Sequence, residues 1–152
     1  MMSDEEILFN PAFIGQVLCN VVKGYTASGK KSMPVSLIYV SLPMILPDKI
    51  RISLKEHSLQ NWCFNNQCHL IFIPDIARVC VPIVNQAISF LIQEKWISLV
   101  GDELILISKK SIVSHTDCQN IEDYLRKASK LGDWFSKANS PKNVYYLLGV
   151  RP

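Results

Sequence analysis

The fold is decided between residues 75 and 108, which read DIARVCVPIVNQAISFLIQEKWISLVGDELILIS. Apolar residues recur at helical spacing on both sides of Pro82, and proline favours the first position of a helix. We therefore expect a short helix at Asp75–Val81 and a second helix at Pro82–Trp96. Two strand-like runs follow, Ile97–Val100 and Leu104–Ser108, and a glycine-containing loop between them is typical of a β-hairpin. Helix, turn, helix and hairpin together predict a winged helix-turn-helix.

Helical patterns flank this segment on both sides. The strongest start signals are Asn10-Pro11 and Ser140-Pro141, in which a capping side chain precedes a proline. The predicted flanking helices are 10–28, a buried helix at 34–46 broken by Pro43, 57–66, 120–137 and a short last helix after 141. We expect one α+β, mainly α domain over 1–152, a helical domain containing the winged helix-turn-helix and its short two-stranded wing. Its parts are a helical N-terminal part at about 10–66, the winged helix at about 70–110 and C-terminal helices at about 119–150.

Composition and charge narrow the class of protein. A chain of 152 residues is the size of one domain. It is 49% hydrophobic and 19% charged, which excludes disorder and predicts more apolar surface than the domain can bury, hence a partner surface. The net charge of +3 is too small for a dedicated nucleic-acid coat. The chain is net −1 up to Leu104 and net +4 beyond it, so the C-terminal third is the basic part.

Cysteine usage and apolar run length favour a cytoplasmic protein. The five cysteines are odd in number and lie in apolar stretches, and no leader pattern precedes them, so we expect reduced thiols that serve as packing residues. The longest apolar run, 34–46, falls short of the ~20 residues that span a bilayer. We therefore expect no membrane association.

No residue pattern in the chain predicts catalysis. His57, Cys63, Cys68 and His69 are possible zinc ligands, but the second half of a zinc motif is missing. Glu94-Lys95 has the residue types of a restriction-type nuclease motif, but the two are adjacent rather than separated by one residue. Gly24–Lys31 resembles the end of a phosphate-binding loop, but no strand precedes it and we interpret it as a solvated loop. We expect a non-enzyme with no metal and no cofactor of its own.

Two surfaces are candidates for binding. The helix Pro82–Trp96 should direct four polar, uncharged side chains outward: Asn85, Gln86, Ser89 and Gln93. Duplex DNA binding draws its affinity from Lys and Arg, and the wing tip Asp102-Glu103 is acidic, so we predict that these four bind a protein partner. The candidates for contact with DNA phosphates are Lys109, Lys110, Arg126, Lys127, Lys130 and Lys137, helped by Lys142. A helix face that also carries Glu122, Asp123 and Asp133 can equally be a solvated surface.

Several stretches resemble one known family over nearly the whole chain. They are Asn10-Pro11-Ala12-Phe13 opening an apolar helix, Met33-Pro34 before the helix that ends in Leu42-Pro43, KLGDWFSKA at 130–138 and VYYLLGVRP at 144–152. With them the chain resembles the middle component of three-component ABC-ATPase (ABC-3C) systems. It is also similar to the small accessory subunit, LmuC, of Lamassu-type anti-phage defence complexes. The shared positions are helix starts and core residues, so no family functional residue carries over.

The resemblance implies a small winged-helix subunit between an SMC-like ABC ATPase and an effector, commonly a nuclease. ATP, magnesium and DNA loading would then belong to the ATPase, and strand cleavage to the effector. This chain would couple the two without chemistry of its own, with DNA contact possible through the complex. Two alternatives stay open: a free-standing winged-helix DNA-binding transcription regulator, and a small enzyme.

Overall fold

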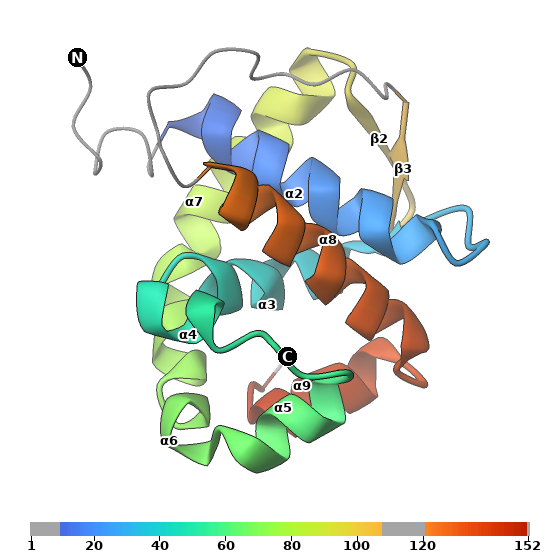
Figure 1. Ribbon diagram of the computed structural model, residues 1–152. Coiled ribbons are helices and arrows are strands. Elements are labelled where there is room, and N and C mark those ends of the chain that lie inside the picture. The colour runs from blue at the N-terminus through green and yellow to red at the C-terminus, as the bar shows by residue number, and fades with distance from the viewer. Residues whose placement is uncertain (1–9, 108–120, 152) are drawn as a thin grey trace.

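The computed structural model describes residues 10–107 and 121–151 and is mainly helical, with one small antiparallel sheet (Figure 1). The elements in chain order are α2 (Pro11–Thr26), β1 (Met33–Pro34), α3 (Val35–Ile45), α4 (Asp48–Ile52), α5 (Leu59–Asn65), α6 (Gln67–Leu70), α7 (Ile73–Gln93), β2 (Ile97–Val100), β3 (Glu103–Leu106), α8 (Ile121–Lys137) and α9 (Pro141–Leu148). The α+β, mainly α prediction is confirmed at this level.

Both predicted helix starts are confirmed. The Asn10 side chain accepts a hydrogen bond from the backbone N–H of Ala12 at 2.8 Å. The hydroxyl oxygen of Ser140 accepts one from the backbone N–H of Asn143 at 3.1 Å and so caps α9. Each side-chain oxygen satisfies one of the free amide groups of a first helical turn. At the other end of α9, Gly149 adopts a left-handed conformation with φ 71°, which ends the helix.

Helices α2 and α8 pack backbone to backbone through two buried glycines. A Cβ atom on Gly24 of α2 would overlap the carbonyl oxygen of Ser129, and one on Gly132 of α8 would overlap that of Val21. Gly24 therefore belongs to a helix interface, and the solvated loop that we predicted from Gly24 begins only after Thr26. The close approach sets α8 across α2, as Figure 1 shows.

Helix α3 forms the centre of the core. Leu37, Ile38, Leu42 and Met44 are at most 1% exposed. The prediction that Pro43 breaks this helix is wrong, since α3 continues to Ile45 with Pro43 inside it. A proline in the last turn removes one backbone hydrogen bond, and the buried side chains on both sides hold the helical path nevertheless.

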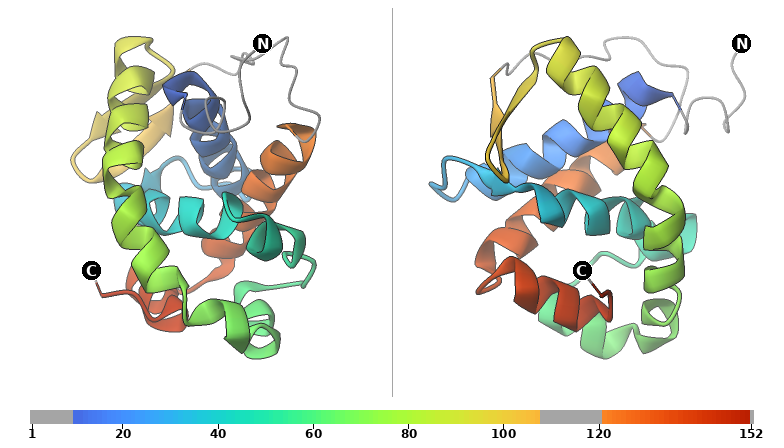
Figure 2. Two further views of the ribbon diagram at one scale, coloured as in Figure 1. Left: turned by 90° about the vertical axis from the view of Figure 1, so that its left-hand side faces the viewer. Right: turned by 180° about the vertical axis from the view of Figure 1, so that it is seen from behind.

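Helix α7 is one continuous helix of 21 residues, so the predicted turn before Pro82 is wrong. Pro74 occupies the first turn of α7, where a proline is tolerated, and Pro82 lies exposed inside the helix. Cys80 and Val84, on either side of Pro82, are both buried, and this packing keeps the two halves in one line. Figure 2 shows α7 along one side of the molecule, from the hairpin to α6.

The hairpin is confirmed, and it has a third strand that we did not predict. Leu99 pairs with Leu104 across β2 and β3, and the connection is the two-residue Gly101-Asp102 rather than three residues. Met33 of β1 pairs with Leu104 on the other side, so the strand order is β1-β3-β2. The backbone N–H of Ile107 donates a hydrogen bond to the carbonyl oxygen of Trp96 at 2.9 Å, which continues the pairing beyond the ends of β2 and β3.

Helix α7 is also the one helix within 10–107 and 121–151 that is long and apolar enough to cross a membrane. This is weak evidence, since a core helix of a soluble protein passes the same test of length and composition. One third of the most apolar stretch of α7 is buried inside the molecule.

Candidate partner-binding surface

The four polar residues that we predicted to face outward do so. Asn85, Gln86, Ser89 and Gln93 are all exposed on α7. Together with Pro11 and Phe90 they line one shallow depression between α7 and the start of α2. No charged side chain lines this depression among the described residues, so the face can bind by hydrogen bonds without any charge to neutralise.

Asn85 is held in place by the core helix α3. The hydroxyl group of Tyr39 donates a hydrogen bond to Asn85 Oδ1 at 2.5 Å. The side-chain amide group of Asn85 keeps its two N–H donors, which makes this residue an oriented donor at the edge of the depression.

Asn85 also lies at the end of a larger groove of about 670 Å³ between α3, α7 and α9. Its apolar lining includes Ala77, Val81 and Val150, and its charged lining residues are Arg78 and Arg151. A second hollow shares Pro74 and Gly149 with this groove, and its apolar lining includes Phe64 of α5, Ile71 just after α6 and Leu147 of α9. The depression, the groove and the second hollow therefore run in sequence along α7.

Large apolar side chains stand exposed around this second hollow. Phe64 is 76% exposed and Ile71 70%. This apolar surface is the surplus that the composition predicted, but its position could not be predicted. Phe64 lies on α5 and Leu147 on α9, and the helical period alone does not place these two at one hollow.

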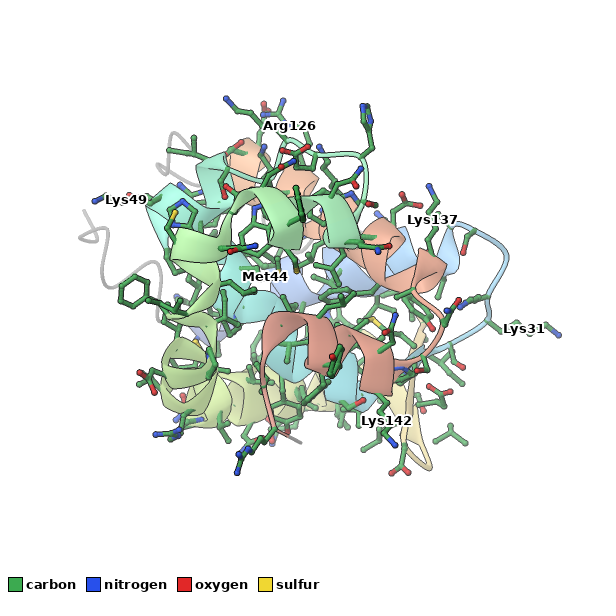
Figure 3. All side chains as sticks on the ribbon, turned by 90° about the horizontal axis from the view of Figure 1, so that it is seen from below. Lys31, Met44, Lys49, Arg126, Lys137 and Lys142 are labelled. Carbon is green, nitrogen blue, oxygen red and sulfur yellow. The ribbon has the colours of Figure 1, made fainter. Side chains whose placement is uncertain are left out.

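Four of the six basic residues that we predicted to contact phosphate lie on α8, within the described part of the chain. Lys109 and Lys110 lie outside the described residues. Arg126 pairs with Asp123 at 3.0 Å, and Lys137 pairs with Asp133 at 3.0 Å. In Figure 3 the labelled lysine and arginine side chains point outward on different sides of the molecule, whereas Met44 lies inside it.

Lys127 and Lys130 also contact the protein itself. Lys127 Nζ donates a hydrogen bond to the carbonyl oxygen of Leu54 at 3.0 Å. Burial lowers the pKa of Lys127, and the neighbouring Asp123 only partly opposes this. Lys130 Nζ lies 5.5 Å from the centre of the Trp134 ring. Both interpretations of this face of α8, phosphate contact and a solvated helix surface, therefore stay predictions.

Arg51 is a buried charge that sequence reasoning missed. Its side chain is 3% exposed, and its guanidinium group donates to Asp48 at 2.7 Å and to Asp123 at 3.0 Å. It also donates to the backbone carbonyl oxygen of Ile45 at 3.1 Å and lies 3.8 Å from the centre of the Tyr124 ring. Burial by itself would raise the pKa of Asp123, but the hydrogen bonds from Arg51 and Arg126 outweigh it and lower that pKa. Arg51 joins α4 to α8 and to the end of α3, and its role is structural.

Four of the five cysteines lie within the described residues, and three of these four are packing residues, whereas Cys118 lies outside the described residues. Cys19, Cys63 and Cys80 are buried, and burial raises their thiol pKa values to about 12, 11 and 11, so these thiols stay protonated at neutral pH. Cys68 is exposed, contrary to our prediction, because it lies on the outer side of the short helix α6. Among the residues that the structure describes, no three His, Cys, Asp or Glu side chains gather as a metal site would require.

Comparison with known proteins identifies one family. The family model described as "ABC-three component (ABC-3C) system Middle Component 3" matches residues 2–152. No curated protein and no solved structure matches the chain.

Proposed function

This chain belongs to the ABC-three component system Middle Component 3 family, and on that premise we propose that it is a non-catalytic accessory subunit that docks partner subunits along α7. A middle component has an accessory role in a multi-component system, with partner subunits that include an ABC ATPase. One observation carries the proposal: the part of α7 that lines the depression is polar and uncharged, and it adjoins an apolar groove at Asn85. Such a mixed surface suits a protein partner, because the depression offers no lysine or arginine to the phosphates of duplex DNA.

The order of the elements supports a winged helix assembled from different helices than we expected. Helix α2, strand β1 and helix α3 come first, and α7 leads into the hairpin of β2 and β3. The strand order β1-β3-β2 brings the first strand against the last. In this proposal α3 and α7 are the second and third helices of a helix-turn-helix, and residues 46–72 are an insertion between them. Helix α7 then occupies the recognition position.

The finer assignment follows the family resemblance. We propose that the ABC ATPase is SMC-like, that the effector is a nuclease, and that this subunit couples the two in a cytoplasmic anti-phage defence complex similar to the Lamassu type. ATP and Mg²⁺ would bind to the ATPase. Contact with DNA would occur through the complex, and Arg126, Lys127, Lys130 and Lys137 on α8 are the candidate phosphate contacts within the described residues.

Co-expression tests the proposal. A tagged copy of this chain, expressed with the neighbouring genes of its native operon, should co-purify with the ABC ATPase at a fixed ratio that survives gel filtration. The isolated chain should not hydrolyse ATP. If the ATPase elutes separately under every condition of salt and nucleotide tried, the accessory role is wrong.

A transcription regulator is the second candidate, and one observation favours it: α7 leads into the hairpin of β2 and β3, as the recognition helix of the proposed winged helix would, with Gln86 and Gln93 exposed. Its test is the affinity of the isolated chain for duplex DNA from its own promoter against unrelated duplex. A preference of about 1,000-fold or more, typical of sequence-specific proteins, would favour the regulator.

A further inference from the structure

We infer that the apolar groove between α7 and α9 binds an amphipathic segment of a partner subunit that presents apolar side chains and at least one carboxylate. The inference rests on the proposed function and adds to it the chemistry of the partner. It uses a surface separate from the polar depression, joined to it only through Asn85.

The groove is formed by side chains that the fold already holds. The Tyr145 hydroxyl group donates to the backbone carbonyl oxygen of Ser36 at 2.6 Å, which ties α9 to the start of α3. The left-handed Gly149 ends α9, and the Val150 N–H then donates to the carbonyl oxygen of Tyr145 at 3.0 Å. Val150 and Arg151 are thereby turned onto the groove opposite α7. A groove held in this way needs little ordering when a partner binds.

The residues that line the groove favour an amphipathic segment that contacts the groove along its whole length. Ala77 and Val81 lie one helical turn apart on α7, and Val150 faces them from beyond α9. The groove continues past Pro74 into the second hollow, where Phe64 and Ile71 are largely exposed. Apolar side chains that recur along one face of a segment would fill such a surface, as in helix-in-groove recognition.

The charge around the groove specifies the rest of the partner. Arg78 and Arg151 are the charged residues among the described side chains that line the groove and the second hollow. Asp75 lies 3.8 Å from Arg78, but both side chains are 80% exposed, so this pair is weak. Two arginines beside apolar walls would pair with a carboxylate that a partner brings, and a partner with lysine there would be repelled.

A charge-reversal pair tests the inference in the complex of full-length chain and ABC ATPase. Arg78→Glu with Arg151→Glu should weaken the affinity about tenfold or more and should remove much of its dependence on salt. The matched control is Lys31→Glu with Lys49→Glu, which makes the same change in charge at two exposed lysines away from the groove, one between α2 and β1 and one on α4 (Figure 3). The control should bind like the wild type, and both variants should melt at the wild-type temperature.

The outcomes separate this inference from the proposed function. If the wild-type complex assembles and the variant Arg78→Glu with Arg151→Glu binds the ATPase as tightly as the control variant, the groove inference is wrong and the accessory role stands. If the wild-type chain and the ATPase do not assemble, both are wrong. The isolated chain is also tested for binding to phosphatidylserine vesicles. If it binds them and the variant Arg78→Glu with Arg151→Glu does not, the groove binds an anionic membrane and not a protein partner. If the variant Arg78→Glu with Arg151→Glu melts at a lower temperature than the wild type, the affinity of Arg78→Gln with Arg151→Gln is measured in its place, and the same outcomes apply.

Discussion

At the scale of single residues, the packing of α2 on α8 depends on two positions that tolerate no side chain. Gly24 and Gly132 each face a backbone carbonyl oxygen of the other helix, and backbone atoms cannot move aside as a side-chain tip can. Tyr124 and Leu131 of α8 are buried against the same interface, so any separation of the helices exposes core.

We predict that Gly132→Ala lowers the free energy of unfolding by about 3 kcal/mol or more, because the added methyl group forces the two helices apart. Gly15→Ala is the matched control on α2. There the new Cβ would meet the flexible side chain of Leu91 at 2.9 Å, and the gain in helix propensity offsets the crowding, so the change should stay within about 1 kcal/mol. Urea unfolding measures both, and equal losses for the two variants would contradict this packing.

Asp123 makes the stability of the chain sensitive to acid. Its pKa is lowered in the folded state, so its contribution is full above the unfolded pKa of about 3.8 and is lost as the pH falls through the lower folded value. We predict that Asp123→Asn costs about 2 kcal/mol at pH 7, since it removes a charged hydrogen bond from the buried Arg51.

The same substitution should flatten the fall in stability below about pH 4 that the wild type shows. Asp133→Asn, which removes only the exposed pair with Lys137, should cost less than about 0.5 kcal/mol. Urea unfolding at a series of pH values checks both variants. An acid transition of Asp123→Asn identical to that of the wild type would show that this carboxylate is not coupled to folding.

The sequence predicted features that depend on neighbouring residues, such as helix caps, and missed contacts between residues that are far apart in the chain. Asn10 and Ser140 cap helices that start at the next residue, so three or four residues contain the whole signal. Arg51 needs Asp48, three residues before it, and also Asp123, on a helix far along the chain. Gly24 acquires its role only when α8 packs on it, so its sequence neighbours gave no sign of an interface.

At the scale of elements, α7 differs most from our prediction. A proline has the same fixed φ whether it starts a helix or lies inside one, so Pro82 predicted a helix start that the structure does not have. The deciding information was tertiary: Ala77, Cys80, Val84 and Leu91 form one buried stripe through both halves. The true start signal was Pro74, in the first turn.

We predict that Pro82→Ala raises the free energy of unfolding by about 1 to 2 kcal/mol. Alanine restores the missing backbone hydrogen bond inside α7, and a more flexible unfolded chain offsets part of that gain. Pro74→Ala, in the first turn of the same helix, should change stability little. Thermal or urea unfolding checks both variants. If Pro82→Ala does not raise the free energy of unfolding, whatever Pro74→Ala does, the result would favour two separate helices that meet at Pro82.

At the scale of the whole molecule, the apolar surplus in the composition becomes a surface along α7. The sequence predicted that such a surface exists and which four polar residues of α7 face outward. It could not predict the groove, because Val81, Val150 and Arg151 meet only through the packing of α9 beside α3. For the same reason the third strand escaped prediction, since Met33 and Leu104 pair although they are 71 residues apart in the sequence.

The central claim is that the outward face of α7 docks a protein partner. The most direct measurement is the dissociation constant of the complex with the ABC ATPase for Gln86→Glu with Gln93→Glu. We predict a loss of about tenfold or more, because two unpaired carboxylates would be desolvated in the interface, while the free chain unfolds as the wild type does.

Asn61→Glu with Asn139→Glu is the control, since it adds two carboxylates at exposed positions off α7 and should leave the dissociation constant unchanged. A wild-type dissociation constant for the Gln86 and Gln93 variant, or equal losses for both pairs, would contradict docking through α7. If that variant instead loses duplex DNA binding while the complex still forms, α7 reads DNA and the regulator replaces the accessory subunit.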